Sequence, residues 1–315
     1  MKLPSFYNLS PEVARRSGPD SALVALESAV ITHGLPYPEN VNLAREMEQE
    51  VRNQGGVPAT VAVIEGRICL GLNEAQLEKL ARADHLLKIS SRDLGHAVAL
   101  NKTGGTTVAG TMAAASKAGI RVFATGGIGG VHRPIPGNQA CSLDVSADLM
   151  QLAHTEMIVV CAGAKAILDL QATLEVLETL EVPVVGYQSD DFPAFYSRQS
   201  GFKASTRAES PQQVVRIART HWESGLGSAI LVVVPPQEEF ALPNALVETA
   251  IQKALAEAEV NKVRGQEVTP FLLEKMVELT QGRSLQANLA LLKNNARLAG
   301  SIAQAWFQSS HLKKA

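Results

Sequence analysis

Apolar positions in this chain form short continuous runs that alternate with longer segments of mixed character. Several runs are rich in β-branched residues and lack the alternation of a half-exposed strand, which is typical of strands buried on both faces. They cover residues 22–26, 60–64, 121–124, 157–161, 182–186 and 229–234. Helix-length segments lie between many of them, at 40–53, 73–83, 107–117, 145–154, 167–180 and 211–223. The alternation predicts an α/β fold with a central mixed, mostly parallel sheet flanked by helices.

The last part of the chain has a different pattern. Segments 244–259, 269–279 and 284–307 read as helices with no strand between them. We predict that they form a C-terminal helical cap, at about 243–308, packed on an α/β body at about 20–240. No repeat or linker divides the chain, so we expect one domain over residues 1–315.

Charge and composition narrow the class of protein. The 29 Lys and Arg residues against 31 Asp and Glu give a net charge of −2, spread along the chain. This argues against a protein that coats nucleic acid or binds a membrane surface. The three cysteines form no CxxC pair, and the chain has neither a secretory signal pattern nor an apolar run long enough to span a bilayer. We expect a cytoplasmic protein that acts on a small molecule.

Two charged residues follow predicted strands and are candidates for chemistry. Glu27 ends the first of these strands, and a carboxyl group close to apolar surface can act as a general acid. Lys165 follows the run MIVVCAGA, where small neighbours leave room for a ligand. Apolar surroundings disfavour the charged form of an amine, as an imine-forming lysine requires. The alternatives are a capping or ion-paired Glu27 and a Lys165 that extends its ammonium group to water.

The segment SLDVSADL indicates a helix start with acidic residues. Asp144 and Asp148 are four residues apart, so they share a helix face, with Ser146 between them. A hard divalent cation such as Mn²⁺ or Mg²⁺ suits one aspartate together with water and a ligand oxygen. Simple helix capping by Asp144 or Ser146 is the alternative.

Two glycine-containing segments are candidates for ligand binding. In GGTTVAGTM, backbone N–H groups and the Thr107 hydroxyl can hold a phosphate at a helix N-terminus. In ATGGIGGVHR, the glycines permit close approach to a ligand, and His132 and Arg133 follow them. Lys88 can supply a neighbouring cation. An ordinary turn with a helix cap, a flexible loop and a surface lysine are the corresponding alternatives.

Amides in the last predicted helix also need an explanation. Asn288, Asn294 and Asn295 lie in QANLALLKNNARLAG, and an amide at a buried position needs hydrogen-bond partners. Either these side chains bind backbone groups, or they face a polar site.

Several long stretches occur in the order found in one known family. They are ALESAVITHGLPYPEN, KISSRDL, GGTTVAGTM, RVFATGGIGGVHR, DVSADL, VVCAGAKAILDL, VPVVGYQSDDFPAFY and LQANLALLKNNARLAG. They run from about residue 21 to 300 and resemble the pseudouridine-5′-phosphate glycosidases, whose fold is also called indigoidine synthase A-like.

The resemblance implies reversible cleavage of the C–C glycosidic bond of pseudouridine 5′-phosphate to uracil and ribose 5-phosphate. It implies that Lys165 forms an imine with C1′ of the ring-opened ribose, that Glu27 donates protons, and that Asp144 binds one Mn²⁺ per subunit of a homotrimer. The imine suits this bond, which has no heteroatom leaving group. The motifs and the resemblance together predict these substrate-binding residues: Lys88, Thr107, Val108, His132, Ser146, Ala147, Asp148 and Asn288.

One segment departs from the family pattern. The connection at 133–143 is longer than expected and contains two prolines, and Leu143 stands where an aromatic residue is usual. One alternative is therefore a related C-glycoside enzyme that acts on ribose 5-phosphate and a different base. The other is a catalytically silent sugar-phosphate-binding protein, which would be expected to lack Lys165 or Glu27.

Overall fold

A computed structural model describes residues 3–16, 18, 20–133, 144–263 and 268–312. One large sheet runs through it, in the order β1-β4-β3-β2-β7-β9-β13-β11-β12, with β6 also paired to β3 and β5 paired to β6. Every neighbouring pair from β3 to β12 in this order is parallel, whereas β4 and β6 are antiparallel to β3. The strands are β1 (Tyr7–Leu9), β2 (Leu23–Leu26), β3 (Val57–Ile64), β4 (Arg67–Leu70), β5 (Leu87–Ile89), β6 (Gly104–Thr106), β7 (Val122–Ala124), β9 (Ile158–Cys161), β11 (Val184–Tyr187), β12 (Thr206–Ala208) and β13 (Ile230–Val233).

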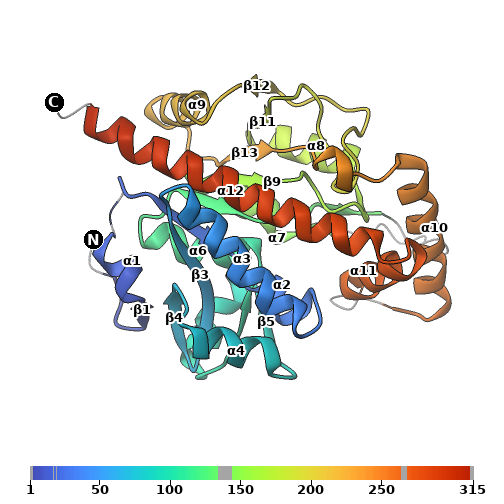
Figure 1. Ribbon diagram of the computed structural model, residues 1–315, viewed down its shortest axis with the longest axis horizontal. Coiled ribbons are helices and arrows are strands. Elements are labelled where there is room, and N and C mark those ends of the chain that lie inside the picture. Colours follow the sequence, from blue (N-terminus) through green and yellow to red (C-terminus); the bar gives the residue numbers. More distant parts are fainter. Residues whose placement is uncertain (1–2, 17, 19, 134–143, 264–267, 313–315) are drawn as a thin grey trace.

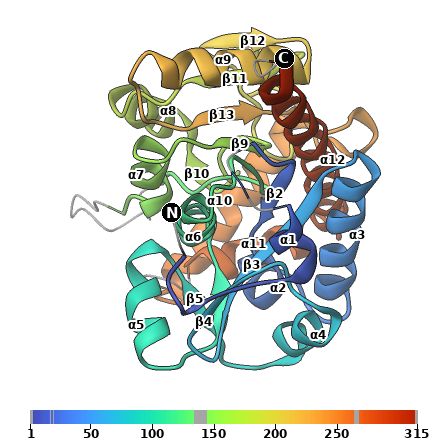
Figure 2. The same ribbon diagram turned by 90° about the vertical axis from the view of Figure 1, so that its left-hand side faces the viewer.

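Helices cover both faces of this sheet. Figure 2 shows α7 and α8 on one side of it and α3 and α12 on the other. A small antiparallel pair, β8 (Val131–His132) with β10 (Leu168–Asp169), stands apart from the main sheet. The helices are α1 (Pro11–Arg15), α2 (Ala29–His33), α3 (Glu39–Asn53), α4 (Glu74–Arg82), α5 (Leu94–Ala99), α6 (Val108–Lys117), α7 (Ala147–Ala153), α8 (Leu170–Thr179), α9 (Pro211–Glu223), α10 (Asn244–Val260), α11 (Val268–Leu279) and α12 (Arg283–Leu312), with short 3₁₀ turns at Ser91–Asp93 and Glu238–Phe240.

The predicted α/β fold is confirmed, and each predicted strand and helix has a counterpart. Strands β2, β7, β9 and β13 are buried along their whole length, as their continuous apolar runs predict; every residue of β9 and β13 is fully buried. At the C-terminal end α10 packs against α11, and the 30-residue α12 then runs back along α3 and over β2, β7 and β9 (Figure 1). The body of α12 thus crosses the middle of the sheet, and the C-terminal end of the helix lies beyond it (Figure 1).

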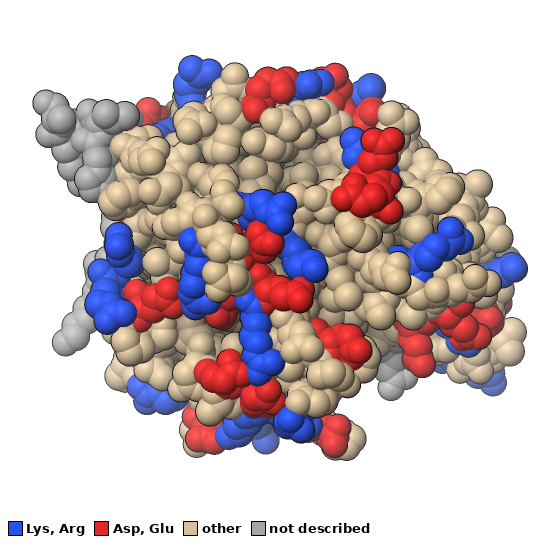
Figure 3. Space-filling view, in the orientation of Figure 1, with Lys and Arg blue, Asp and Glu red and all other residues tan. Residues whose placement is uncertain are grey.

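The surface carries both signs of charge close together. In Figure 3 blue and red side chains lie interspersed over the face shown. Helices α3 and α12 are joined by two ion pairs, Arg297–Glu50 at 2.8 Å and Lys293–Glu46 at 3.1 Å. No helix in the described part of the chain is long and apolar enough to cross a membrane. Cys69 and Cys161 are buried free thiols, and Cys141 lies outside the described residues.

Candidate active site

Three adjacent parallel strands bring the predicted chemistry to one edge of the sheet. The register pairs Leu26 of β2 with Ala124 of β7, and Ala124 with Val160 of β9. The residues that follow these strands therefore share the carboxyl edge, where α/β proteins bind ligands. Glu27 lies next to Thr125 at this edge, and the Thr125 hydroxyl donates a hydrogen bond to Glu27 Oε1.

A cavity of about 80 Å³ opens at this edge. It adjoins a wider hollow of about 590 Å³, with which it shares five lining residues, among them His33 and Asn288. The two together give the space that a nucleotide-sized ligand needs. The smaller cavity is lined by Glu27, Ala29, Val30, His33, Gly34, Lys88, Gly126, Gly127, Lys165, Phe195, Thr269, Pro270, Leu273, Asn288 and Leu292. Four of the predicted site residues, Glu27, Lys88, Lys165 and Asn288, thus converge.

Glu27 has the environment of a general acid. Its side chain is buried, with 9% of the residue exposed. Burial raises the pKa of Glu27, while the nearby charge of Lys165 and the hydrogen bond from Thr125 oppose the rise. The charge of Asp148 adds to the rise, and that of Lys88 lowers the pKa. A raised pKa widens the pH range over which a carboxyl group carries the proton that a general acid delivers to a bound substrate.

The two lysines reach the cavity from different elements. Lys165 follows β9 after three small residues. Its backbone N–H donates to the Ile128 carbonyl at 3.0 Å, which joins it to residues 126–130 after β7, called the glycine loop below. Lys88 lies on β5, and burial lowers its pKa, with a further lowering by the positive charge of Lys165. Two cations next to one buried carboxyl group suit an anionic substrate.

Asp148 holds two parts of the site together. It is 5% exposed, and its Oδ1 accepts from the Ala109 N–H at 2.9 Å while Oδ2 accepts from the Gly129 N–H at 2.8 Å. Both carboxylate oxygens are thus engaged by backbone amides, one at the start of α6 and one in the glycine loop. Asp148 also lies close enough to Glu27 and Lys88 to influence the pKa of each.

The start of α6 is capped by the protein itself. Thr107 is the N-cap residue and accepts from the Gly110 N–H at 3.3 Å. The amides of Ala109 and Gly110, which can bind a phosphate in other proteins, therefore already have side-chain acceptors. Thr107 is half-buried and Val108 is 1% exposed; both lie at the start of the helix, outside the lining of the small cavity.

The glycine loop is needed for close packing as well as for access. A Cβ atom at Gly127 would lie 2.6 Å from the Phe195 ring, and one at Gly129 would lie 2.2 Å from the Ser146 hydroxyl oxygen. Gly127 lines the cavity, whereas Gly129 is covered by Ser146, the N-cap residue of α7. Ala147, which follows it, is exposed.

The predicted metal ligand lies at the rim of the described region. The Asp144 side chain is 51% exposed, and its Oδ2 is 3.9 Å from Nδ1 of His132. Within the described residues no group of three or more His, Cys, Asp and Glu side chains could hold a metal ion. One exposed carboxylate fits a hard cation that keeps most of its ligands as water or substrate oxygens. The longer connection at 134–143 lies outside the described residues.

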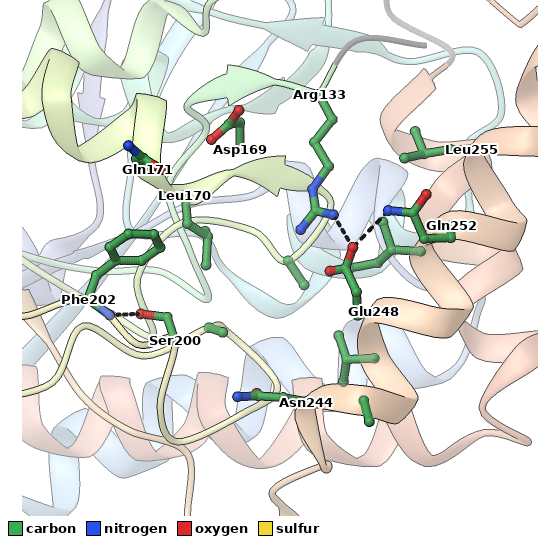
Figure 4. Close-up of a pocket in the computed structure, with 15 residues that line it drawn as sticks. Arg133, Asp169, Leu170, Gln171, Ser200, Phe202, Asn244, Glu248, Gln252 and Leu255 are labelled. Atoms are coloured by element: carbon green, nitrogen blue, oxygen red, sulfur yellow. Dashed lines mark hydrogen bonds and ion pairs between the residues drawn. The ribbon is translucent and has the colours of Figure 1, made fainter. Parts of the chain in front are cut away.

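A second, larger cavity lies beyond β10. It measures about 720 Å³ and is lined by residues from α8, α10 and the loop around Phe202. Figure 4 shows Arg133 pointing across it to Glu248, with an N–O distance of 2.7 Å, and Glu248 also accepts from Gln252. Arg133, which follows the glycines of the motif ATGGIGGVHR, therefore has its guanidinium group paired with Glu248 and with the Leu168 carbonyl.

Some lining residues were not predicted. His33 follows Glu27 by six positions in the same motif, and Phe195 lies in the loop after β11 with a backbone φ of 62°. Thr125, which donates a hydrogen bond to Glu27, was not predicted either. Its position directly after a predicted strand is the signal that could have identified it as a site residue. Nothing in the sequence pattern indicates the left-handed backbone that turns Phe195 toward Gly127.

The fold and the cavity together indicate an α/β enzyme whose cavity for a small molecule is lined by a buried carboxyl group, Glu27, and by the amines of Lys88 and Lys165. The chain belongs to the family described as indigoidine synthase A like protein, whose family model matches residues 12–305.

Similar proteins cover nearly the whole chain. A protein named pseudouridine-5′-phosphate glycosidase from Caldanaerobacter subterraneus is 50% identical over 298 residues, which is 95% of this chain and 96% of that protein. One of the same name from Escherichia coli is 48% identical over 302 residues, 96% of each chain. The crystal structure of the prealnumycin C-glycosynthase AlnA in complex with ribulose 5-phosphate has a TM-score of 0.89 at 37% identity and covers 98% of this chain and 100% of AlnA. An indigoidine synthase A-like protein from Thermotoga maritima has a TM-score of 0.83 at 37% identity, covering 94% of this chain and 95% of its own.

Proposed function

We propose that the protein cleaves the C–C glycosidic bond of pseudouridine 5′-phosphate, reversibly, to uracil and ribose 5-phosphate. The observation that carries the proposal is the convergence of Glu27, Lys88 and Lys165 in one cavity of a chain about 50% identical to glycosidases of that name. A catalytically silent binding protein has no need of a lysine and a buried acid at the same place.

Lys165 is the proposed nucleophile. Once the ribose ring is open, C1′ is accessible to the Lys165 amine. Opening the ring breaks the C1′–O4′ bond: electrons of the uracil ring form a double bond to C1′, and Glu27 protonates O4′. The Lys165 amine adds to C1′ and loses a proton, and the electrons of that double bond return to the base. The nitrogen lone pair then forms the imine as the C–C bond breaks with its electron pair going to the base, and water hydrolyses the imine to ribose 5-phosphate. The uracil carbon that held the sugar takes a proton, so the base departs as a neutral molecule.

Glu27 is the proposed proton donor, and the remaining predicted residues orient the substrate. The raised pKa of Glu27 favours its protonated form, which is the form that can donate a proton in the ring-opening step. Such a proton transfer contributes about 10² to 10⁴ in rate. Lys88 would bind the phosphate group. Asn288 lines both hollows and can bind the base or the sugar.

Asp144 is the residue that would hold a Mn²⁺ ion. The ion would supply charge stabilisation and orientation for phosphate or hydroxyl oxygens.

We further propose, on the family resemblance, that the protein is a homotrimer in the cytoplasm. Light scattering on the peak eluted from a size-exclusion column tests the assembly. A single trimer mass is expected, and a monomer mass contradicts it.

A second candidate function is a C-glycoside synthesis with another acceptor. The similarity to AlnA, named a C-glycosynthase, favours it, because the same lysine and acid would serve both reactions.

The two functions are separated by incubating the purified protein and Mn²⁺ with pseudouridine 5′-phosphate and analysing the products by chromatography. Release of uracil and ribose 5-phosphate is expected. No release by folded, metal-loaded protein would favour the second function, and aromatic acceptors with ribose 5-phosphate would then be tried.

A further inference from the structure

The carbonyl group of Thr125 has an unusual partner. Strand β7 ends at Ala124, so the ladder to β2 no longer serves the residue that follows. The Thr125 N–H still donates to the Val160 carbonyl at 3.0 Å. Its carbonyl oxygen instead accepts from Nδ2 of Asn295, at 2.9 Å, although the two residues are 170 positions apart.

Asn295 is a buried amide with half of its hydrogen-bonding capacity unused. It is 1% exposed on α12, and Nδ2 also approaches the Gly126 carbonyl at 3.5 Å. Because two carbonyl oxygens face this end of the amide, it must be the nitrogen that points at them. The Oδ1 atom has no hydrogen-bond partner among the described residues. Leaving one buried oxygen unpaired costs free energy, so the hydrogen bonds of the Asn295 nitrogen need an explanation.

Thr125, whose carbonyl group Asn295 binds, is also the residue that donates a hydrogen bond to Glu27, the proposed acid. With its N–H and carbonyl group both engaged, the Thr125 backbone is fixed, and its fully buried side chain donates to Glu27 Oε1. The single hydroxyl hydrogen is used there, so a proton carried by Glu27 lies on the other oxygen, Oε2.

We propose that Asn295 is a positioning residue for Glu27, acting through the Thr125 backbone and hydroxyl. Asn295 is not itself among the residues that line the cavity. The proposal rests on the proposed function for its effect on rate, since that function makes Glu27 the proton donor.

The direction of the effect on Glu27 follows from the groups that face it. Besides Thr125, these are Lys165 after β9, Lys88 on β5 and Asp148 on α7. The Thr125 hydrogen bond favours the carboxylate and lowers the pKa of Glu27. Displacing the hydroxyl removes that lowering, so the pKa of Glu27 rises. An acid acts while protonated, so the decline of activity at high pH moves to higher pH.

The test compares Asn295→Leu with Asn294→Leu, the same change at the neighbouring, half-buried position of α12. Leucine branches at Cγ as asparagine does, has the same number of heavy atoms and removes the orphaned oxygen, so the variant is expected to fold. For Asn295→Leu we expect kcat for uracil release to fall roughly ten- to hundredfold with little change in KM, and the high-pH limb to move upward. Thr125→Val should give the same shift of the high-pH limb, and Thr125→Ser, which keeps the hydroxyl group, should retain the wild-type pH profile.

A second measurement does not depend on turnover. The Glu27 carboxyl carbon is titrated by NMR in protein labelled with ¹³C-glutamate and assigned with Glu27→Gln. A higher Glu27 pKa in Asn295→Leu and Thr125→Val, and an unchanged one in Asn294→Leu, supports positioning. A wild-type titration in Asn295→Leu overturns it. If wild-type protein releases no uracil, the proposed function fails, and the NMR titration alone decides the role of Asn295.

Discussion

At the scale of single residues, the cavity brings Glu27 together with Lys88 and Lys165, and Asp148 lies close enough to influence the pKa values of Glu27 and Lys88. Burial lowers the pKa of Lys88 and raises that of Glu27, so each ionised form is disfavoured before substrate enters. A phosphate group beside Lys88 would favour its charged form, and the raised pKa of Glu27 favours the protonated form that a general acid uses. These opposite shifts are typical of an acid and a binding cation in one site.

For Lys88→Gln we expect KM for pseudouridine 5′-phosphate to rise roughly ten- to hundredfold. The lost hydrogen bond to a charged group contributes about 1.5–3 kcal/mol. Steady-state kinetics measures the change, and pseudouridine without its phosphate is the control substrate. An equal loss with that control would show that Lys88 does not bind the phosphate.

For Glu27→Gln we expect kcat to fall by about 10² to 10⁴. The amide keeps the shape of Glu27 and can still accept from Thr125, but it cannot give up a proton. In wild type, activity should decline as pH rises through the Glu27 pKa, which burial places above its ordinary value. A pH–rate profile of both proteins is the measurement, and an unchanged kcat in the variant would remove Glu27 from the chemistry.

At the scale of elements, the carboxylate of Asp148 joins α7 to the start of α6 and to the glycine loop. For Asp148→Asn we expect the free energy of unfolding to drop by about 1–3 kcal/mol, because the amide nitrogen would face a backbone N–H and leave a buried donor unpaired. Denaturant unfolding measures it, with the exposed Asp84→Asn as the matched control. If the two variants are equally stable, the two backbone hydrogen bonds contribute nothing.

The long periodic elements and the residues at the ends of buried strands were predictable from sequence, and the short elements were not. Gly104–Thr106 reads as a turn, yet it forms β6, because β5 and β3 pair with it on either side. Glu27 and Lys165 were found because each follows an apolar run. The link from Asn295 to Thr125 depends on tertiary packing of α12, which no local pattern carries.

At the scale of the whole molecule, no cluster of three metal-binding side chains supports the fold in the described ranges. We therefore expect chelation of Mn²⁺ to lower activity while the melting temperature changes little. Activity before and after verified metal removal, with Asp144→Asn as the comparison, measures this. Wild-type kinetics in metal-free protein would contradict a cation at Asp144.

The central claim is that Lys165 carries the sugar through a covalent intermediate, and trapping that intermediate tests it most directly. Wild-type protein and Lys165→Ala are incubated with ribose 5-phosphate, reduced with borohydride and digested for mass spectrometry. We predict a reduced pentose phosphate adduct on the peptide that contains Lys165, and none in the folded variant. An adduct on another lysine, or no adduct in wild type that turns over substrate, would contradict the account.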